Sequence, residues 1–286
     1  MIGMSEEEPF IIIFTDLDGT LLDHDSYEWS KAEPAIDLCN NLSVPVVMVS
    51  SKTRAEMDIL RKELGFSFPF ISENGGGIFF PDESIRDAPP DTVLLDGLRI
   101  WHMGIPYKHL IKSLQEIQDG LRYRLKGFSE MTVEEIAGLT GLDNESSRRA
   151  IMREFDEPFI VEESDFDINA LYNAAQEKDL MISQGGRFFH LHGKYDKGDA
   201  VKKLISWYGK SFAQVFSVAL GDSPNDFSMF EKVDQPVLVR SAHEFENIEK
   251  RIPNIITTSV MGPKGWNNTV IDILNRKFKG GISCHV

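Results

Sequence analysis

Residues 10–23 of the 286-residue chain read FIIIFTDLDGTLLD. The apolar run 10–14 ends at two aspartates, Asp16 and Asp18, and a glycine turn follows at once. A continuous run this short is typical of a buried parallel strand. Open α/β sheets keep their chemistry at the carboxyl ends of such strands, and two close carboxylates need a hard cation or a shared proton. The stretch predicts an acidic site at a sheet edge, although an Asp-rich turn after a core strand has the same spacing.

The composition is that of an acidic globular protein. The hydrophobic content is 42% and the formal net charge is −15 at pH 7. This charge argues against general binding to nucleic acid or acidic membranes, so local cations must capture any anionic substrate. The apolar runs are shorter than the roughly 20 residues of a membrane helix, and the acidic N-terminus lacks a signal-peptide pattern. Cys39 and Cys284 have no metal-type spacing, and we expect a reduced, cytoplasmic protein.

The N-terminal and C-terminal parts of the chain share one pattern of secondary-structure signals, and the middle part has another. Strand patterns that alternate with helical patterns occur at 10–14, 44–49 and 215–220. Residues 81–91 are instead rich in proline and charge, and the segment after them is more helical. The sequence predicts a doubly wound, mostly parallel α/β core formed by residues 1–83 and 193–286, with residues 84–192 inserted as an α/β cap domain.

Local signals predict where several helices begin. Thr53 and Thr132 each begin a T-x-x-E capping box. Asp143 is expected to cap a helix over 144–155, which Pro158 would end.

Polar residues also mark three further segments that this topology can bring to the same edge. Ser50 follows the second strand, Lys197 begins a helix, and GDSPND at 221–226 follows the third strand. Each has an ordinary alternative. Ser50 can be a local cap, and Ser51 is a rival for its phosphate-binding role. A lysine at a helix start is usually solvated, and an acid near a helix N-terminus can be only a capping group.

Taken together, D-x-D-G-T, a strand ending in serine, Lys-Gly and G-D-S-x-N-D resemble the haloacid dehalogenase superfamily. The insert resembles the α/β cap of its sugar-phosphatase branch. Segments in both core and cap, including VSSKTRAEM, REFDEPF and GPKGWN, resemble the mannosyl-3-phosphoglycerate phosphatases. The resemblance implies a Mg²⁺-dependent phosphatase for a sugar-type phosphomonoester, with mannosyl-3-phosphoglycerate as the favoured substrate and mannosylglycerate as the product.

The resemblance also implies roles for individual residues. Asp16 would be the nucleophile that forms an aspartyl-phosphate, Asp18 the general acid and base, and Lys197 the cation that offsets the charge of nucleophile and phosphate. The implied metal-binding residues are Asp16, Asp18 through its carbonyl, Asp222, and, through metal-bound waters, Asn225 and Asp226.

The candidate substrate contacts are Gly19, Thr20, Ser50, Ser51, Glu73, Asn74, Arg187 and Lys264. For Arg187, Lys264 and Glu157, a surface or structural role is an equal alternative. Arg187 is a candidate for a glycerate carboxylate because its fork matches that group, and Glu157 is a candidate for sugar hydroxyls. Glu73 and Asn74 resemble a loop that faces the leaving group, although a hairpin turn has the same sequence.

Other functions fit the same residues. The alternatives are a phosphatase for glucosyl-3-phosphoglycerate or a sucrose phosphate, a phosphosugar mutase, and a non-enzymatic sugar-phosphate sensor. A sensor predicts a lost nucleophile or metal acid, yet Asp16, Asp18, Lys197 and Asp222 are all present. The sequence carries no signal for the oligomeric state or the preferred divalent metal.

Overall fold

The computed structural model describes residues 9–81, 88–185, 187–242 and 245–278. Part of the predicted linker, residues 82–87, and Cys284 lie outside these ranges. The chain divides into two compact units, one of Met1–Val49 with Lys197–Val286 and one of Ser50–Asp196. The predicted core and cap have other boundaries, and that division stays a prediction. Among the described helices, none combines the length and the apolar character needed to cross a membrane.

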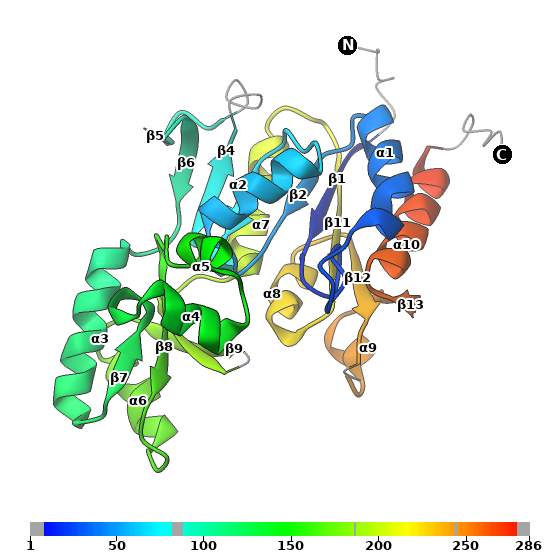
Figure 1. Cartoon of the computed structure of the whole chain (residues 1–286). Coiled ribbons are helices and arrows are strands. Elements are labelled where there is room, and N and C mark those ends of the chain that lie inside the picture. Colours follow the sequence, from blue (N-terminus) through cyan, green and yellow to red (C-terminus); the bar gives the residue numbers. More distant parts are fainter. Residues whose placement is uncertain (1–8, 82–87, 186, 243–244, 279–286) are drawn as a thin grey trace. The chain divides into compact units, whose positions relative to one another are not determined.

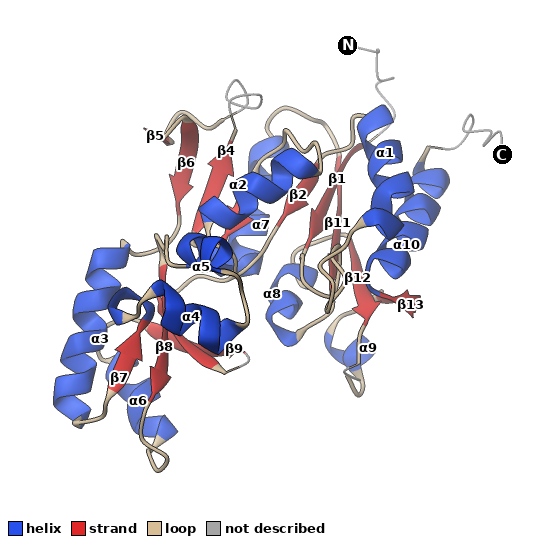
Figure 2. Ribbon diagram, viewed as in Figure 1, coloured by secondary structure: helices blue, strands red, loops and turns tan. Residues whose placement is uncertain are grey.

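The first unit is built on a parallel sheet with the strand order β13-β12-β11-β1-β2. Its strands are β1 (Phe10–Thr15), β2 (Val46–Met48), β11 (Val215–Gly221), β12 (Gln235–Arg240) and β13 (Ile256–Met261). Strand β1 lies between β11 and β2 and is buried from Ile11 onward, which explains its unbroken apolar run. The predicted α/β fold class is confirmed (Figures 1 and 2).

The described residues of this unit also form five α-helices. They are α1 (Glu33–Asn41), α7 (Lys197–Tyr208), α8 (Phe227–Phe230), α9 (Ile248–Arg251) and α10 (Gly262–Lys277). Helices α1 and α10 contact each other and lie side by side in Figure 1. Each has a proline in its first turn, Pro34 and Pro263, where a missing N–H removes no helical hydrogen bond.

The second unit contains two antiparallel sheets. One has the order β3-β4-β6-β5, formed by Phe70–Ser72, Gly77–Phe80, Leu98–His102 and Val93–Leu95. The other has the order β7-β8-β10-β9, formed by Leu125–Gly127, Asp156–Val161, Phe188–His192 and Met181–Gly185.

The helices of this unit are α2 (Arg54–Glu63), α3 (Tyr107–Leu121), α4 (Val133–Thr140), α5 (Asn144–Ala150) and α6 (Ile168–Gln176). The capping boxes predicted at Thr53 and Thr132 are confirmed, since each threonine side chain accepts the N–H of the glutamate three residues on. That glutamate bonds back to the N–H of the threonine.

The helix expected over 144–155 is wrong at its C-terminal end. Helix α5 ends at Ala150, and the REFDEPF segment runs into strand β8, where Pro158 lies opposite His190. The N–H groups of residues 154 and 155 do not continue a helix, because they donate to the carboxylate of Glu73. A tertiary partner therefore replaces the helical hydrogen bonds that the local pattern predicts.

Candidate active site

Four polar residues of the first unit meet at the carboxyl ends of β1 and β11. Asp16 follows β1, Asp222 follows β11, Lys197 is the first residue of α7, and Asp226 ends the 3-10 turn η5 (Pro224–Asp226). Lys197 Nζ lies 2.6 Å from Asp16 Oδ1 and 2.6 Å from Asp226 Oδ1. All four side chains are buried, and Lys197 is only 1% exposed. The structure thus brings together four of the predicted site residues.

The acids of this cluster form a group that can hold a metal ion. Carboxylate oxygens of Asp16, Asp222 and Asp226 all lie within 4.8 Å of one another. Three carboxylates and one lysine leave negative charge in excess in a buried place. An all-oxygen donor set of this kind suits a hard divalent cation.

The D-x-D-G-T turn leaves room for the Asp222 side chain to lie close to the main chain at Gly19. Gly19 has a φ of +77°, and a Cβ on it would lie 2.6 Å from Asp222 Oδ2, so a side chain here would clash. Thr20 is buried, and its hydroxyl donates to Asp222 Oδ1 at 3.4 Å. Asp18 is half-buried in the same turn, which bridges back to Leu22.

Asp226 organises the loop after β11. Its Oδ2 accepts the N–H groups of Asp222 and Ser223, both at 3.0 Å, while its Oδ1 binds Lys197. A Cβ on Gly221 would lie 2.4 Å from Asp226 Cγ, so only glycine fits before Asp222. Asn225 is exposed and its Oδ1 accepts a hydrogen bond from the Ser223 hydroxyl.

The charges of the cluster are reflected in its pKa values. Burial, with the nearby Asp226 and Asp18, raises the pKa of Asp16 to about 8, although Lys197 opposes the change. Burial and Asp226 likewise raise the pKa of Asp222 to about 6. Burial alone lowers the pKa of Lys197, but Asp16 and Asp226 outweigh it and raise the pKa above its usual value. Additional positive charge at this place would favour the ionised carboxylates.

A cavity of about 480 Å³ opens beside Asp222 within the first unit. Gly19 and Asp222 line it together with His24, Gly262 and the exposed cation Arg240. A volume of about 300–1,000 Å³ is usual for small-molecule sites. Arg240 was not predicted from the sequence as a site residue, because a single arginine at the end of a strand belongs to no recognisable motif.

A family model described as haloacid dehalogenase-like hydrolase matches residues 13–93 and 143–259, which include all four clustered residues. The chain belongs to the haloacid dehalogenase-like hydrolases. The predicted family resemblance is thereby confirmed. Within the described residues, Asp16, Asp222 and Asp226 form a group that can hold a metal ion.

Named relatives align with most of this hydrolase chain. The glucosyl-3-phosphoglycerate/mannosyl-3-phosphoglycerate phosphatase of Methanococcoides burtonii is 37% identical over 270 residues, which cover 93% of this chain and 97% of the relative. The mannosyl-3-phosphoglycerate phosphatase of Pyrococcus horikoshii is 35% identical over 236 residues, which cover 80% of this chain and 90% of the relative. The predicted enzyme class, a phosphoric monoester hydrolase, is confirmed.

Solved structures share the fold of this hydrolase. A Thermoplasma acidophilum structure has a TM-score of 0.66 at 20% identity and covers 93% of this chain and 99% of its own. The sucrose-phosphatase of Synechocystis, solved with sucrose and phosphate, has a TM-score of 0.60 at 15% identity and covers 92% and 98%.

The predicted phosphate-binding serines, Ser50 and Ser51, are the first two residues of the second unit. Ser50 is 1% exposed, its N–H donates to the Ile71 carbonyl at 3.0 Å, and its hydroxyl oxygen accepts the N–H of Lys52 at 3.2 Å. Ser51 is half-buried, and its main-chain carbonyl accepts a hydrogen bond from Arg153. Contact of either hydroxyl with phosphate stays a prediction.

Glu73 and Asn74 lie in the turn between β3 and β4. Glu73 is 1% exposed, and its carboxylate accepts the N–H groups of Glu154 and Phe155 at 2.8 to 3.2 Å. Asn74 donates its N–H to the Ser50 carbonyl at 2.9 Å. In this structure Glu73 holds the REFDEPF segment, and a contact of Glu73 or Asn74 with the leaving group stays a prediction.

Burial raises the pKa of Glu73 to about 8, although Arg153 opposes the change. The folded state therefore binds a proton more tightly than the unfolded state, whose glutamate has a pKa near 4.5. Stability from this group should be complete below about pH 4.5 and should decline as the pH rises through 8. The Glu73→Gln variant lacks this titration, so its free energy of unfolding should rise relative to the wild type by about 1 kcal/mol or more over that window. Urea unfolding across the pH range tests this, and parallel profiles would contradict it.

A buried charged group around Arg153 was not predicted from the sequence. Arg153 Nη1 lies 3.4 Å from Asp156 Oδ2, which also lies 2.9 Å from Nδ1 of His190. Burial favours neutral Asp156, but His190 and Arg153 together hold its pKa below the usual range. The signal was the Arg–Asp pair three residues apart in REFDEPF, which the expected helix obscured.

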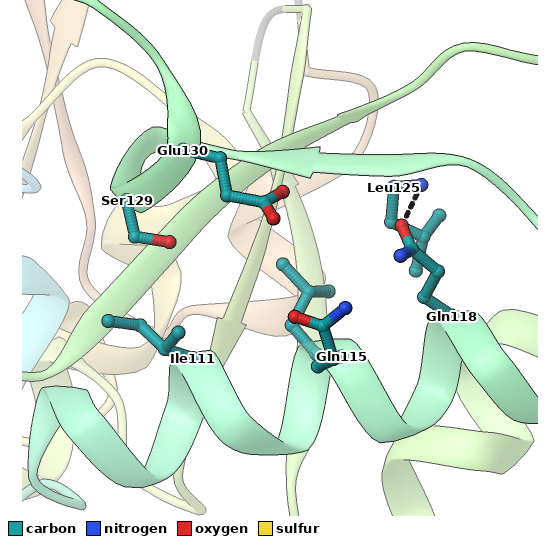
Figure 3. Close-up of a pocket in the computed structure, with 7 residues that line it drawn as sticks. Ile111, Gln115, Gln118, Leu125, Ser129 and Glu130 are labelled. Atoms are coloured by element: carbon teal, nitrogen blue, oxygen red, sulfur yellow. Dashed lines mark hydrogen bonds between the residues drawn. The ribbon is translucent and has the colours of Figure 1, made fainter.

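Glu157 is fully buried in β8 and is held by the protein itself. Its Oε1 accepts the N–H and the hydroxyl of Ser129 at 3.1 and 2.6 Å, and a Cβ on Gly127 would lie 2.1 Å from it. Ser129 and Glu130 face helix α3 across a cavity of about 10 Å³ (Figure 3), room for at most one water molecule. A contact of Glu157 with sugar hydroxyls stays a prediction.

The two predicted substrate cations are both exposed. Arg187 lies in the turn before β10, and its Nη1 donates to the main-chain carbonyl of Leu139. Lys264 lies in the first turn of α10. Because β10 begins at Phe188, strand alternation does not decide the direction of Arg187. Their roles stay predictions.

Proposed function

We propose that this chain is a Mg²⁺-dependent phosphatase that converts mannosyl-3-phosphoglycerate to mannosylglycerate and inorganic phosphate. The observation that carries the proposal is the ion pair of Lys197 with Asp16 inside a group of buried carboxylates. The names of the relatives support the substrate, and two of them also name glucosyl-3-phosphoglycerate, which is the second candidate. The cytoplasm is the proposed compartment.

The proposed reaction has two steps. A carboxylate oxygen of Asp16 attacks phosphorus, the bond from phosphorus to the ester oxygen breaks, and Asp18 gives that oxygen a proton. A water molecule then attacks the phosphorus of the aspartyl-phosphate while Asp18 takes the water proton. The bond from phosphorus to Asp16 breaks, which restores the carboxylate and releases phosphate. General acid–base help of this kind contributes about 10²–10⁴-fold.

Other side chains hold the reacting groups in place. Lys197 fixes the Asp16 carboxylate at 2.6 Å and offsets part of the negative charge that phosphate brings. The hydroxyl of Ser50 and the N–H groups of Gly19 and Thr20 are proposed to bind phosphate oxygens. These contacts orient phosphorus toward Asp16, which is the main task of a phosphoryl-transfer site.

The residues proposed to hold Mg²⁺ are Asp16 and Asp222 with the Asp18 main-chain carbonyl. Asp226 and Asn225 are proposed to act through waters, since both Asp226 oxygens are already engaged by Lys197 and by the 222–223 N–H groups. When bound, the ion supplies positive charge that favours ionised Asp16 and a bound phosphate.

The leaving group is proposed to carry a carboxylate and sugar hydroxyls. Arg187 and Lys264 are the proposed cations for a glycerate carboxylate, and Glu157, Glu73 and Asn74 the proposed partners of the sugar. Arginine suits a carboxylate because two of its N–H groups match the two oxygens.

A phosphate-release screen tests the function. The panel contains mannosyl-3-phosphoglycerate, glucosyl-3-phosphoglycerate, sucrose phosphate and simple hexose phosphates, each with Mg²⁺ and with EDTA. We expect a glycosyl-3-phosphoglycerate to have the highest kcat/KM and EDTA to abolish release. Asp222→Asn should raise the Mg²⁺ concentration for half-maximal rate by about tenfold or more, whereas the exposed Asp272→Asn should not change it. Isomerised sugar without free phosphate would indicate a mutase, and binding without turnover a sensor.

A further inference from the structure

The main-chain carbonyl of Asp16 lies just beyond the ladder of β1. Strand β1 ends at Thr15, and its neighbours fix the chain up to that point, because the Asp16 N–H donates to the Leu220 carbonyl and the Thr15 carbonyl accepts the Val49 N–H, both at 2.8 Å. The Asp16 carbonyl has a different partner. The hydroxyl of Thr15 donates to it at 2.7 Å.

A tryptophan far along the chain completes this arrangement. The indole N–H of Trp266 donates to Thr15 Oγ1 at 3.0 Å, and both side chains are 0% exposed. An indole N–H can only donate, so the Thr15 oxygen must accept from it. The single hydroxyl proton of Thr15 is then left for the Asp16 carbonyl. Hydrogen bonds in such a chain strengthen one another.

The fold makes a specific place for Trp266. A Cβ on Gly265 would lie 2.1 Å from the Val260 carbonyl oxygen and 2.8 Å from Thr258 Oγ1, so only glycine lets the start of α10 approach β13 this closely. The GPKGW segment thereby places an indole N–H at the end of β1. Apolar packing alone would not require a donor at this position.

We propose that Trp266 is a positioning residue that acts through Thr15 on the main chain of Asp16. The inference rests on the proposed role of Asp16 as nucleophile. With the N–H of Asp16 held by Leu220, rotation about the N–Cα bond of Asp16 would move its carbonyl and its carboxylate together, away from Lys197 and from the line of attack on phosphorus. The Trp266–Thr15–Asp16 chain of hydrogen bonds restrains that rotation. Its loss should therefore slow the chemical step more than it weakens substrate binding.

Four variants separate positioning from packing. Thr15→Val and Trp266→Phe each break the chain, and the double variant removes both partners. We expect each single variant to lower kcat by about tenfold with KM changed by less than about twofold. The double variant should lose no more kcat than the larger single loss, because both substitutions break one chain. Thr15→Ser keeps the hydroxyl and should keep kcat within about threefold of the wild type.

Matched measurements make each outcome decisive. Trp101→Phe is the control, because it removes an indole hydrogen bond to Asp91 in the other compact unit and should leave kcat unchanged. Thermal unfolding is recorded for every variant. Wild-type kcat in Thr15→Val, in Trp266→Phe or in the double variant would overturn the inference, as would kcat losses that only follow the losses in stability. Full activity of Asp16→Asn would instead overturn the proposed function.

Discussion

Asp16→Asn is expected to lower the kcat of phosphate release by about 10⁴-fold or more, because an amide oxygen is a far poorer nucleophile toward phosphorus than a carboxylate. The variant should fold at least as well as the wild type. Burial and neighbouring acids raise the pKa of Asp16 to about 8, so the folded protein disfavours the charged form that asparagine removes. Phosphate release and thermal unfolding measured on the same preparation test both statements.

Two further variants sharpen this test. Asp37→Asn makes the same change at an exposed residue of helix α1 in the same unit and should leave kcat unchanged. Asp18→Asn keeps the nucleophile but removes the base for the second step, so it should accumulate covalently bound phosphate that mass spectrometry detects. An Asp16→Asn variant with wild-type kcat would exclude Asp16 as the nucleophile.

Lys197→Met is expected to destabilise the first unit by about 3–5 kcal/mol, because it leaves two buried carboxylates without their cation. Lys197 Nζ lies 2.6 Å from Asp16 Oδ1 and 2.6 Å from Asp226 Oδ1. Because Lys197 is only 1% exposed, water does not screen these ion pairs. We also expect kcat to fall by about 10²–10³-fold, since the same cation is proposed to offset charge in the transition state. Urea unfolding and phosphate release are the measurements.

The pH dependence of Lys197→Met gives an independent check. Lys197 is the largest influence that lowers the pKa of Asp16, so its loss should raise that pKa further. Carboxyls with a raised folded pKa stabilise the protein below their unfolded pKa of about 3.8 and lose this contribution as the pH rises. The stability deficit of Lys197→Met should therefore shrink toward low pH. Lys202→Met, an exposed lysine of the same helix, should match the wild type, and a constant deficit would contradict the charge argument.

The parts of the structure that the sequence predicted depend on short-range patterns. The buried run before Asp16 and the threonine–glutamate pairs at Thr53 and Thr132 are local signals, and the elements formed as expected. Asp16, Lys197, Asp222 and Asp226 were recognised by motif order, and parallel topology brings strand ends and helix starts to one edge. Their catalytic roles stay predictions.

The parts that the sequence did not predict depend on distant partners. Glu73 caps main-chain N–H groups 81 residues later, which changes the end of the expected 144–155 helix. Trp266 and Thr15 are separated by 251 residues, and a tryptophan in an apolar pattern is usually a core residue. Strand β5 is exposed along its length, so it lacks the alternation that identifies a half-buried strand.

The pairing of Phe10 in β1 with Val215 in β11 has a consequence for biosynthesis. At roughly 5–20 residues per second, translation needs roughly 10–40 s to deliver β11 after β1 has left the ribosome. Residues 50–196 emerge within that interval, so the second unit can finish folding before β11 is available to pair with β1. The nascent chain must keep one of its most apolar segments from aggregating until its partner strand exists.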